Sequence, residues 1–296
     1  MSVVKSYLKQ SFFALFVHNI WISFLSKTFF YDFECEIKLY QLRRSNRRRN
    51  KKTVDFFPGF PCCGFSLYKI LRVLGCRMTN ALNQNADLLV RWELGTYMQP
   101  MSCKTKVLNG DCLDISKERV DKIFKEVFGY SSFVNPATFI GLCVKKSNNN
   151  ATHDGHILHC PNDSVEDGYV YQRLIDTQVD DEFVRDIRVP IIGRSIPCVL
   201  FKYRRIVDQF NNIRKAELHN TYEVFSSDEI NMISIFANKM NLDYGELDIL
   251  RDRDDGRLYI IDCNTTPFGR SYLSDKDWKD YFSILADSFY NEFLCK

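Results

Sequence analysis

Apolar and polar residues alternate most clearly over residues 243–267, DYGELDILRDRDDGRLYIIDCNTTP. A period of two predicts two short strands, because successive side chains of a strand point to opposite faces of the sheet. Asp255-Gly256, between the two runs, is a strong hairpin signal. The segment is therefore predicted to be an antiparallel hairpin, and its register decides which polar side chains share a face.

The apolar residues of the hairpin favour one register. A three-residue loop at 254–256 places Leu247 opposite Cys263 and Ile249 opposite Ile261, so that one face is apolar throughout. A two-residue loop would mix apolar and polar residues on both faces, and a slip of one residue exchanges the faces entirely. We therefore expect the three-residue loop, with its glycine in the left-handed conformation.

In this register the other face gathers four oxygen-bearing side chains. Asp248 lies opposite Asp262, and Glu246 lies opposite Asn264. Carboxylates this close repel one another, and a cation relieves that repulsion. A set of oxygen ligands without His or Cys suits magnesium or manganese. The alternative is a solvated outer face of an ordinary hairpin.

The same patterns predict alternating strands and helices along the rest of the chain. Strands are expected at 54–60 and 86–94, and a hairpin at 181–204; helices are expected at 66–75, 116–129 and 227–240 and near the C-terminus. The fold class is therefore α/β (α+β). We divide the chain into an aromatic N-terminal segment with a basic run (1–53), a small α/β domain (54–105) and a larger domain (106–296).

Composition and charge bear on the number of domains and on nucleic-acid binding. A chain of 296 residues that is 45% hydrophobic and 26% charged is long enough for one large or two medium domains. Residues 43–52 (RRSNRRRNKK) hold seven Lys or Arg, whereas the rest of the chain has a net charge of −4. The run lacks interleaved aromatic residues for base stacking, so a linker is favoured over a nucleic-acid site.

The cysteines and the N-terminal segment bear on location. Eleven cysteines without a CxxC pair indicate buried, reduced thiols in a cytoplasmic protein. Residues 8–30 contain no 18 consecutive apolar residues and no clear signal peptide. An amphipathic helix that docks on the body, on a partner or on a membrane surface is expected there.

A second polar feature follows the apolar strand that ends at Lys146. The loop 147–155, SNNNATHDG, comes directly after it. A Lys at a strand end followed by a small polar loop is typical of a nucleotide phosphate site, where the ammonium supplies charge and backbone N–H groups surround the oxygens. The alternative is an ordinary hairpin loop with an exposed Lys.

Cations alternate along the predicted hairpin at 181–204. Asp186 and Arg188 share a face of its first strand, and Lys202 and Arg204 share a face of its second. Cations so placed could stabilise charge on a transferring phosphoryl group. A solvated face with mixed charges is the alternative.

Taken in order, these features resemble the ATP-grasp superfamily. The chain has a Lys with a polar loop, a hinge-like strand (VYQRLID, 170–176), an Arg-bearing hairpin, and then Asp…Asp-x-Asn followed by Pro. The resemblance spans about residues 106–270 and is most specific in the acidic hairpin. It implies two α+β subdomains that clasp ATP, preceded by a small α/β pre-grasp domain.

The resemblance also implies roles for individual residues. Metal ligands would be Asp248, Asp262 and Asn264, although the family more often has Glu in place of Asp262. Nucleotide contacts would come from Lys117, Lys146, Ser147, Gln172, Arg173 and Leu174; the family commonly has an acid at Gln172. Catalytic cations would be Arg188, Lys202 and Arg270, the last holding an anionic substrate.

The activity implied is an ATP- and magnesium-dependent ligation of a carboxylate to an amine or thiol through an acyl phosphate. Such an enzyme needs no covalent nucleophile, and the chain has no Ser-His-Asp or Cys-His signature. The alternatives are a phosphotransferase on the same site and a catalytically silent ATP-grasp-like binding module. The sequence does not identify the substrates, which we expect to be small molecules or peptides.

Overall fold

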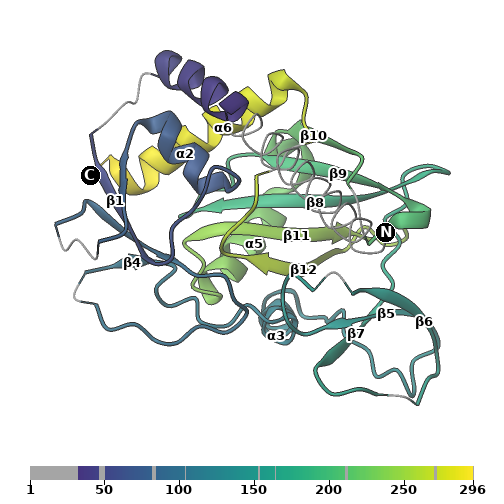
Figure 1. The fold of residues 1–296 in the computed structure, drawn as a ribbon. Coiled ribbons are helices and arrows are strands. Elements are labelled where there is room, and N and C mark those ends of the chain that lie inside the picture. The colour runs from purple at the N-terminus through teal and green to yellow at the C-terminus, as the bar shows by residue number, and fades with distance from the viewer. Residues whose placement is uncertain are drawn as a thin grey trace, which may run out of the picture.

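A computed structural model of the protein describes residues 33–46, 51–81, 85–103, 105–152, 154–163, 165–210, 213–269 and 272–295. These residues form three β-sheets with helices packed between and beside them (Figure 1). The apolar stretch at 8–30, residues 47–50 of the basic run and Arg270 lie outside the described residues.

The first sheet has four parallel strands in the order β2-β1-β3-β4. Its elements are β1 (Thr53–Pro58), α2 (Ser66–Leu74), β2 (Arg77–Thr79), β3 (Leu88–Trp92) and β4 (Val107–Leu108). The predicted strands and the helix at 66–75 are confirmed, and Gly75 ends that helix in the left-handed conformation. β4 belongs to the first sheet but lies just past residue 105, where we placed the boundary between the two domains. The division into 54–105 and 106–296 therefore remains a proposal.

A helix at 33–45 covers the first sheet together with α2 and α6 (Asp275–Phe289), as Figure 1 shows. Leu39 and Leu42 are buried in one core with α2, the sheet and α6. Glu36 accepts hydrogen bonds from Tyr68 and Arg72 of α2. The end of the N-terminal segment is therefore part of the folded body. The π-helical turn η2 (Tyr290–Leu294) follows α6.

The second sheet has five antiparallel strands in the order β10-β9-β8-β11-β12. Its strands and the elements between them are β8 (Phe183–Ile192), β9 (Val199–Arg205), η1 (Ile206–Asp208), β10 (Lys215–His219), α4 (Thr221–Val224), α5 (Ser227–Lys239), β11 (Tyr244–Arg251) and β12 (Leu258–Asn264). One face packs on α5 and α3 (Lys117–Phe128) and forms a second core. Both helices expected from the sequence are present with capping residues at their ends: Ser116 and Gly129 bound α3, and Ser226 with Glu229 forms a capping box on α5.

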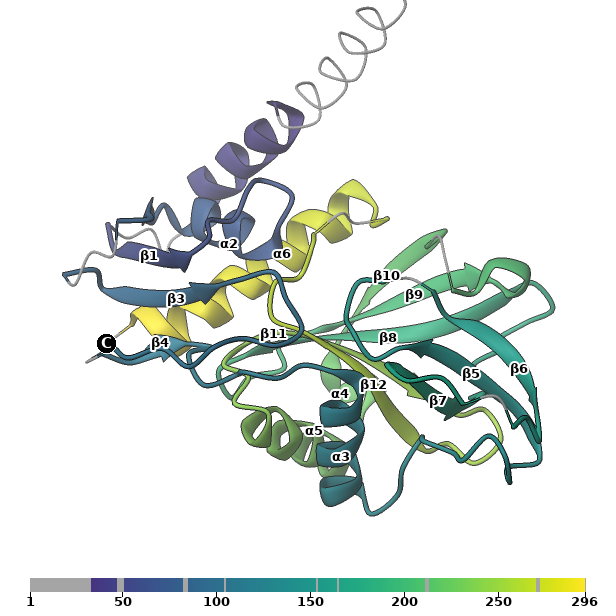
Figure 2. The same ribbon diagram turned by 60° about the horizontal axis from the view of Figure 1, so that its bottom comes forward.

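The third sheet is small and antiparallel, in the order β6-β5-β7. Its strands are β5 (Gly141–Ser147), β6 (His156–Cys160) and β7 (Tyr169–Arg173). Figure 2 shows it beside the second sheet, at the other end of the molecule from the first sheet. Cys143 and Cys160 lie in its small core with their sulfurs 3.1 Å apart, and all eleven cysteines of the chain are free thiols.

The β11–β12 hairpin has the predicted register where it carries the acidic residues. Asp248 pairs with Asp262, Glu246 with Asn264 and Leu247 with Cys263. Beyond them the prediction is wrong, because a β-bulge makes Ile249 pair with Ile260 and leaves Ile261 as the extra residue.

The bulge also lengthens the connection. The last pair is Arg251 with Leu258, so six residues (252–257) link the strands instead of three. Gly256 has φ 72°, as expected for a left-handed turn residue. An unpaired bulge residue re-aims its backbone groups, and here the Ile261 carbonyl accepts a hydrogen bond from Lys146 Nζ at 3.3 Å.

Within the described ranges, none of the helices combines the length and apolarity needed to span a membrane.

Candidate nucleotide site

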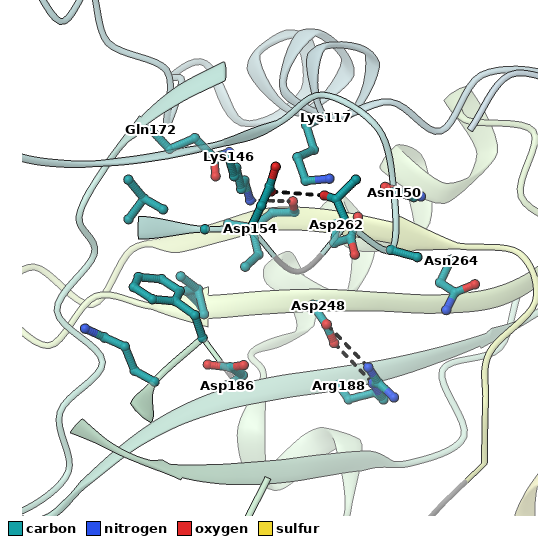
Figure 3. Close-up of a pocket in the computed structure, with 18 of the residues that line it drawn as sticks. Lys117, Lys146, Asn150, Asp154, Gln172, Asp186, Arg188, Asp248, Asp262 and Asn264 are labelled. Carbon is teal, nitrogen blue, oxygen red and sulfur yellow. Dashed lines mark hydrogen bonds and ion pairs between the residues drawn. The ribbon is translucent and has the colours of Figure 1, made fainter. Parts of the chain in front are cut away.

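A cavity of about 760 Å³ lies between the third sheet, the second sheet and the loop after β3. Figure 3 shows that its side chains come from several elements: Lys117 opens α3, Lys146 lies near the end of β5, Arg188 lies on β8, and Asp248 and Asp262 lie on the hairpin. Nine of the predicted site residues line it: Lys117, Lys146, Gln172, Arg173, Leu174, Arg188, Asp248, Asp262 and Asn264. The fold therefore brings together residues from positions 117 to 264.

Three predicted residues are placed differently. Lys202 is buried behind the wall, and Ser147 is buried beside it; neither is among the lining residues. Arg270 is not among the residues that the structure describes. Lys202 nevertheless reaches the site, because its Nζ donates to Asp248 Oδ1 at 2.8 Å.

Two lysines supply positive charge at the inner end of the cavity. Lys117 is buried, and its Nζ donates to the Asn149 carbonyl at 2.7 Å. Burial lowers the pKa of Lys146 to about 8, with Asp262 opposing the shift and Lys117 adding to it. Burial likewise lowers the pKa of Lys117. Two ammonium groups held this way favour a polyanionic ligand, which would restore the charge stabilisation that they lose by leaving water.

Asp262 is the carboxylate that faces these lysines. Its Oδ1 is buried and accepts no hydrogen bond among the described residues. Burial raises the pKa of Asp262, although Lys117 and Lys146 oppose the rise. A buried oxygen without a donor is costly unless a ligand completes it, so this atom has the character of an incomplete metal site.

Asp248, by contrast, is already compensated. Arg188 Nε and Lys202 Nζ lie 3.2 and 2.8 Å from its Oδ1, and Arg188 Nη2 lies 3.4 Å from Oδ2. Burial opposes ionisation of Asp248, but these two cations outweigh it and hold the pKa of the carboxyl well below its usual range. The sequence interpretation assigned relief of the acidic repulsion to a metal alone and missed these protein cations.

Glu246 forms the far side of the same network. It is buried; Arg188 Nε lies 3.2 Å from its Oε2, and Tyr281 of α6 donates to its Oε1 at 3.1 Å. Burial raises the pKa of Glu246 against the pull of Arg188. Arg188 is thus held between two carboxylates, which fixes its guanidinium at the cavity wall; Figure 3 shows its contacts with Asp248.

Three further charged residues, to which the family resemblance assigned no role, also line the cavity: Asp154, Asp186 and Arg204. Asp186 and Arg204 face each other on β8 and β9 and form an ion pair. Lys202 lies 4.0 Å from Asp186 and links this pair to Asp248. In the sequence, the alternation of charges along 181–204 was the one indication that Asp186 and Arg204 could belong to the site. Their position beside the acidic hairpin follows only from the pairing of β8 with β11.

The loop 147–155 is anchored rather than open. The backbone N–H groups of Ser147, Asn149 and Asn150 donate to Asp154, to Ser147 Oγ and to Thr96 Oγ1. Asn150 Nδ2 also donates to the Cys263 carbonyl of β12 at 3.0 Å. The loop therefore lies closed against β12, with these amides engaged within the protein.

The hinge residues line the opposite wall. Gln172 is buried and donates to Ser132 Oγ at 2.9 Å, which leaves its amide oxygen available. Arg173 lies against Tyr259 and pairs with Asp252 at 3.3 Å. The Leu174 N–H donates to the Leu142 carbonyl, so that amide is already used.

The side-chain oxygens of the cavity could supply part of the coordination shell of a hard divalent ion. Asp262 Oδ1 is free to coordinate, and the Asn264 side-chain oxygen accepts from the Thr266 N–H at 2.9 Å but retains a second lone pair. Among the described residues no group of three or more His, Cys, Asp or Glu is placed to hold a metal by itself. Phosphate oxygens would have to complete the shell, as magnesium commonly requires in nucleotide sites.

Comparisons with known proteins agree with this architecture. No family model and no curated protein matches the chain. Among solved structures, the ATP-grasp ligase PsnB complexed with a phosphomimetic variant of its minimal precursor, Mg and ADP is similar, with a TM-score of 0.54 and 13% identity, over 83% of this chain and 99% of that chain. The VanG D-Ala:D-Ser ligase from Enterococcus faecalis is similar with a TM-score of 0.51 and 10% identity, over 83% and 100%.

The chain has the ATP-grasp fold. The cavity lies where the third sheet, the second sheet and the acidic hairpin meet, and the expected fold class is confirmed. Identities of 10–15% show the fold and not the activity, because one fold hosts many functions.

Proposed function

We propose that this protein is an ATP- and magnesium-dependent ligase that joins a carboxylate to an amine or thiol. One observation carries the proposal: the buried Lys117 and the half-buried Lys146 face the unpartnered buried oxygen of Asp262 in one cavity. That set suits a nucleotide triphosphate chelated to a divalent ion, magnesium or manganese. Reduced thiols throughout accord with a cytoplasmic location.

Each side chain has a task under this proposal. Lys117 and Lys146 would bind phosphate oxygens, and Gln172, Arg173 and Leu174 would contact the base. Asp262 and Asn264 would hold the metal, with Asp248 as a third ligand once a cation shifts from it. The bound ion would neutralise charge on the phosphates and polarise the transferred group.

Arg188 would stabilise the transferring phosphoryl group, because its guanidinium is fixed at the cavity wall by Asp248 and Glu246. The carboxylate substrate attacks the γ-phosphorus, ADP leaves, and the amine then displaces phosphate from the acyl phosphate. A group pre-positioned in this way need not reorganise during the reaction. Lys202 would act from behind the wall by holding Asp248, and Arg270 remains a proposed contact for an anionic substrate.

Neighbours with this fold indicate the range of substrates. PsnB was solved with a precursor peptide, and VanG is named for D-Ala and D-Ser. We propose a peptide or amino-acid-like pair of substrates for this chain.

The first experiment is calorimetry of Mg·ADP and Mg·ATP with wild type and Asp262→Ala. Binding that weakens at least about tenfold in the variant supports the site. Asp181→Ala, an exposed acid in the turn before β8, is the matched control and should bind like wild type. Wild-type protein that is folded yet binds neither nucleotide contradicts the ligase and the phosphotransferase together.

A second candidate function has an observation of its own. Because Arg188 and Lys202 already occupy Asp248, the chain could be a silent ATP-grasp-like binding module. Nucleotide binding with no ADP release in the presence of any carboxylate and amine favours that function. ADP release without a joined product favours the phosphotransferase.

A further inference from the structure

A second, smaller groove of about 360 Å³ opens at the edge of the first sheet. Its walls come from the ends of two neighbouring strands: Pro58, Gly59 and Phe60 after β1, and Trp92, Glu93 and Leu94 after β3, with Phe65 before α2. Gly59 permits the close approach, because its N–H donates to the Trp92 carbonyl and a Cβ there would lie 2.8 Å from that oxygen.

The position of this groove is one at which α/β sheets bind ligands. β1 continues to β2 on one side, whereas β3 continues to β4 on the other, so the strand order reverses between β1 and β3. The crevice outside the carboxyl ends of parallel strands at such a reversal is the usual ligand site of open sheets. The topology therefore points to a ligand independently of the lining.

The lining is apolar and rich in aromatic rings. Phe65 packs edge-on against Trp92, with ring centroids 5.1 Å apart, and Phe60 packs edge-on against Phe56. Leu94 and Phe60 remain 72% and 45% exposed. Among the described residues Glu93 alone lines the groove with a charge, and the buried Arg91 pairs with it at 2.9 Å. The groove thus offers apolar surface and a carboxylate that is already neutralised.

The groove adjoins the nucleotide cavity. Phe65 and Leu94 line both. Phe65 also forms a β-bridge and a ring contact with Phe268, which follows the acidic hairpin. Phe268 lies against Gly64, where a Cβ would meet its ring at 2.4 Å. The rings of Phe65 and Phe268 are in contact with each other, so a molecule that spans the groove and the cavity would pass along Phe65 and Leu94 and not between the rings.

We propose that this groove binds a bulky apolar or aromatic side chain of one ligase substrate, so that the substrate is a hydrophobic amino acid or a peptide bearing such a residue. That the bound molecule is a substrate rests on the ligase function proposed above, whereas the presence of an apolar binding site does not depend on that function. Charged side chains are disfavoured, because the groove offers no unpaired opposite charge to offset their desolvation.

The test is saturation-transfer NMR on the full chain with two small probes, N-acetyl-phenylalanine amide and N-acetyl-glutamate amide. Wild type should transfer saturation to the phenylalanine ring and not to the glutamate probe. Leu94→Asp and Phe60→Asp should each raise the dissociation constant of the phenylalanine probe about tenfold or more, because each replaces apolar lining by charge. Ile140→Asp, at an exposed apolar position that lines neither cavity, should not.

Mg·ADP calorimetry on the same samples separates the two proposals. Equal binding of both probes, or unchanged affinity for the phenylalanine probe in both groove variants, overturns the groove assignment even if nucleotide binds. If the probes bind in the expected pattern but the wild type binds no nucleotide, the groove assignment stands and the ligase proposal is wrong. If one groove variant loses both the phenylalanine probe and Mg·ADP, the other groove variant decides the assignment. Phe60 suits this purpose because it lines the groove and not the nucleotide cavity.

Discussion

Single residues of the site are set by burial and by a few charged neighbours. Asp262 and Asp248 lie opposite each other on one hairpin, yet burial raises the pKa of the first while two cations lower that of the second. The pairing followed from apolar alternation in the sequence. The cations of β8 and β9 could not be assigned to Asp248, because sequence does not say which strands become neighbours.

Lys146 gives a prediction on pH. Its pKa of about 8 in the free protein means that protons are taken up when phosphates bind and restore its usual basicity. The contribution of Lys146 to nucleotide affinity should therefore be constant below about pH 7 and fall above pH 8, by at most about tenfold per pH unit. Calorimetry in buffers of different ionisation enthalpy measures the proton uptake. Lys146→Arg, which stays charged, should bind without this fall; an equal fall in that variant assigns the titration elsewhere.

Arg188 gives a prediction on stability. Arg188→Met leaves Glu246 and Asp248 with less compensation in a buried network, and the free energy of unfolding should drop by about 3–5 kcal/mol. Urea denaturation measures it. Arg205→Met, which removes an exposed ion pair with Glu182 at the end of β9, should change it by about 1 kcal/mol or less. Equal effects of the two changes would show that the Arg188 network contributes no more than a surface pair.

At the scale of elements, capping residues and periodicity were reliable guides. Ser116 and Gly129 bound α3, and the Ser226–Glu229 box begins α5, as local chemistry requires. The bulge at Ile261 was not predictable, because IID reads as unbroken strand. Its cause is tertiary: the extra residue keeps Ile260 in the core and sends Ile261 and Asp262 to the cavity side.

The hairpin turn offers a test of backbone conformation. Gly256→Ala should destabilise the protein by about 1 kcal/mol, because φ is 72° while nothing lies within 4 Å of an added Cβ. Gly256→Asn should lose less, since Asn tolerates the left-handed region. Thermal unfolding followed by circular dichroism checks both. A larger loss in Asn than in Ala would contradict a purely conformational cost.

At the scale of the whole molecule, the N-terminal helix joins two parts of the body. The helix at 33–45 contacts α2 through Glu36 and α6 through the ion pair of Lys38 with Asp275. It shares one core with the first sheet. The sequence left open whether this segment folds onto the body, because an apolar face does not identify the surface that covers it.

Leu39 tests that packing. The side chain is buried at the centre of the helix contact, and Leu39→Ala should reduce the free energy of unfolding by about 2–5 kcal/mol. Ile37→Ala, two residues away on the exposed face, should reduce it by about 0.5 kcal/mol or less. Urea denaturation measures both. Similar small losses for both would mean that the helix is detached in solution.

The sequence by itself determined the hairpin with its facing acids, the helix ends and the resemblance that pointed to an ATP-grasp fold, because periodicity, caps and turn residues act over short stretches of chain. The tertiary structure decided which charges meet. Arg188 and Lys202 compensate Asp248, Lys117 and Lys146 face Asp262, and an aromatic groove of the first sheet adjoins the same cavity. These pairings join residues tens to hundreds of positions apart, and only the packing of three sheets against one another fixes them.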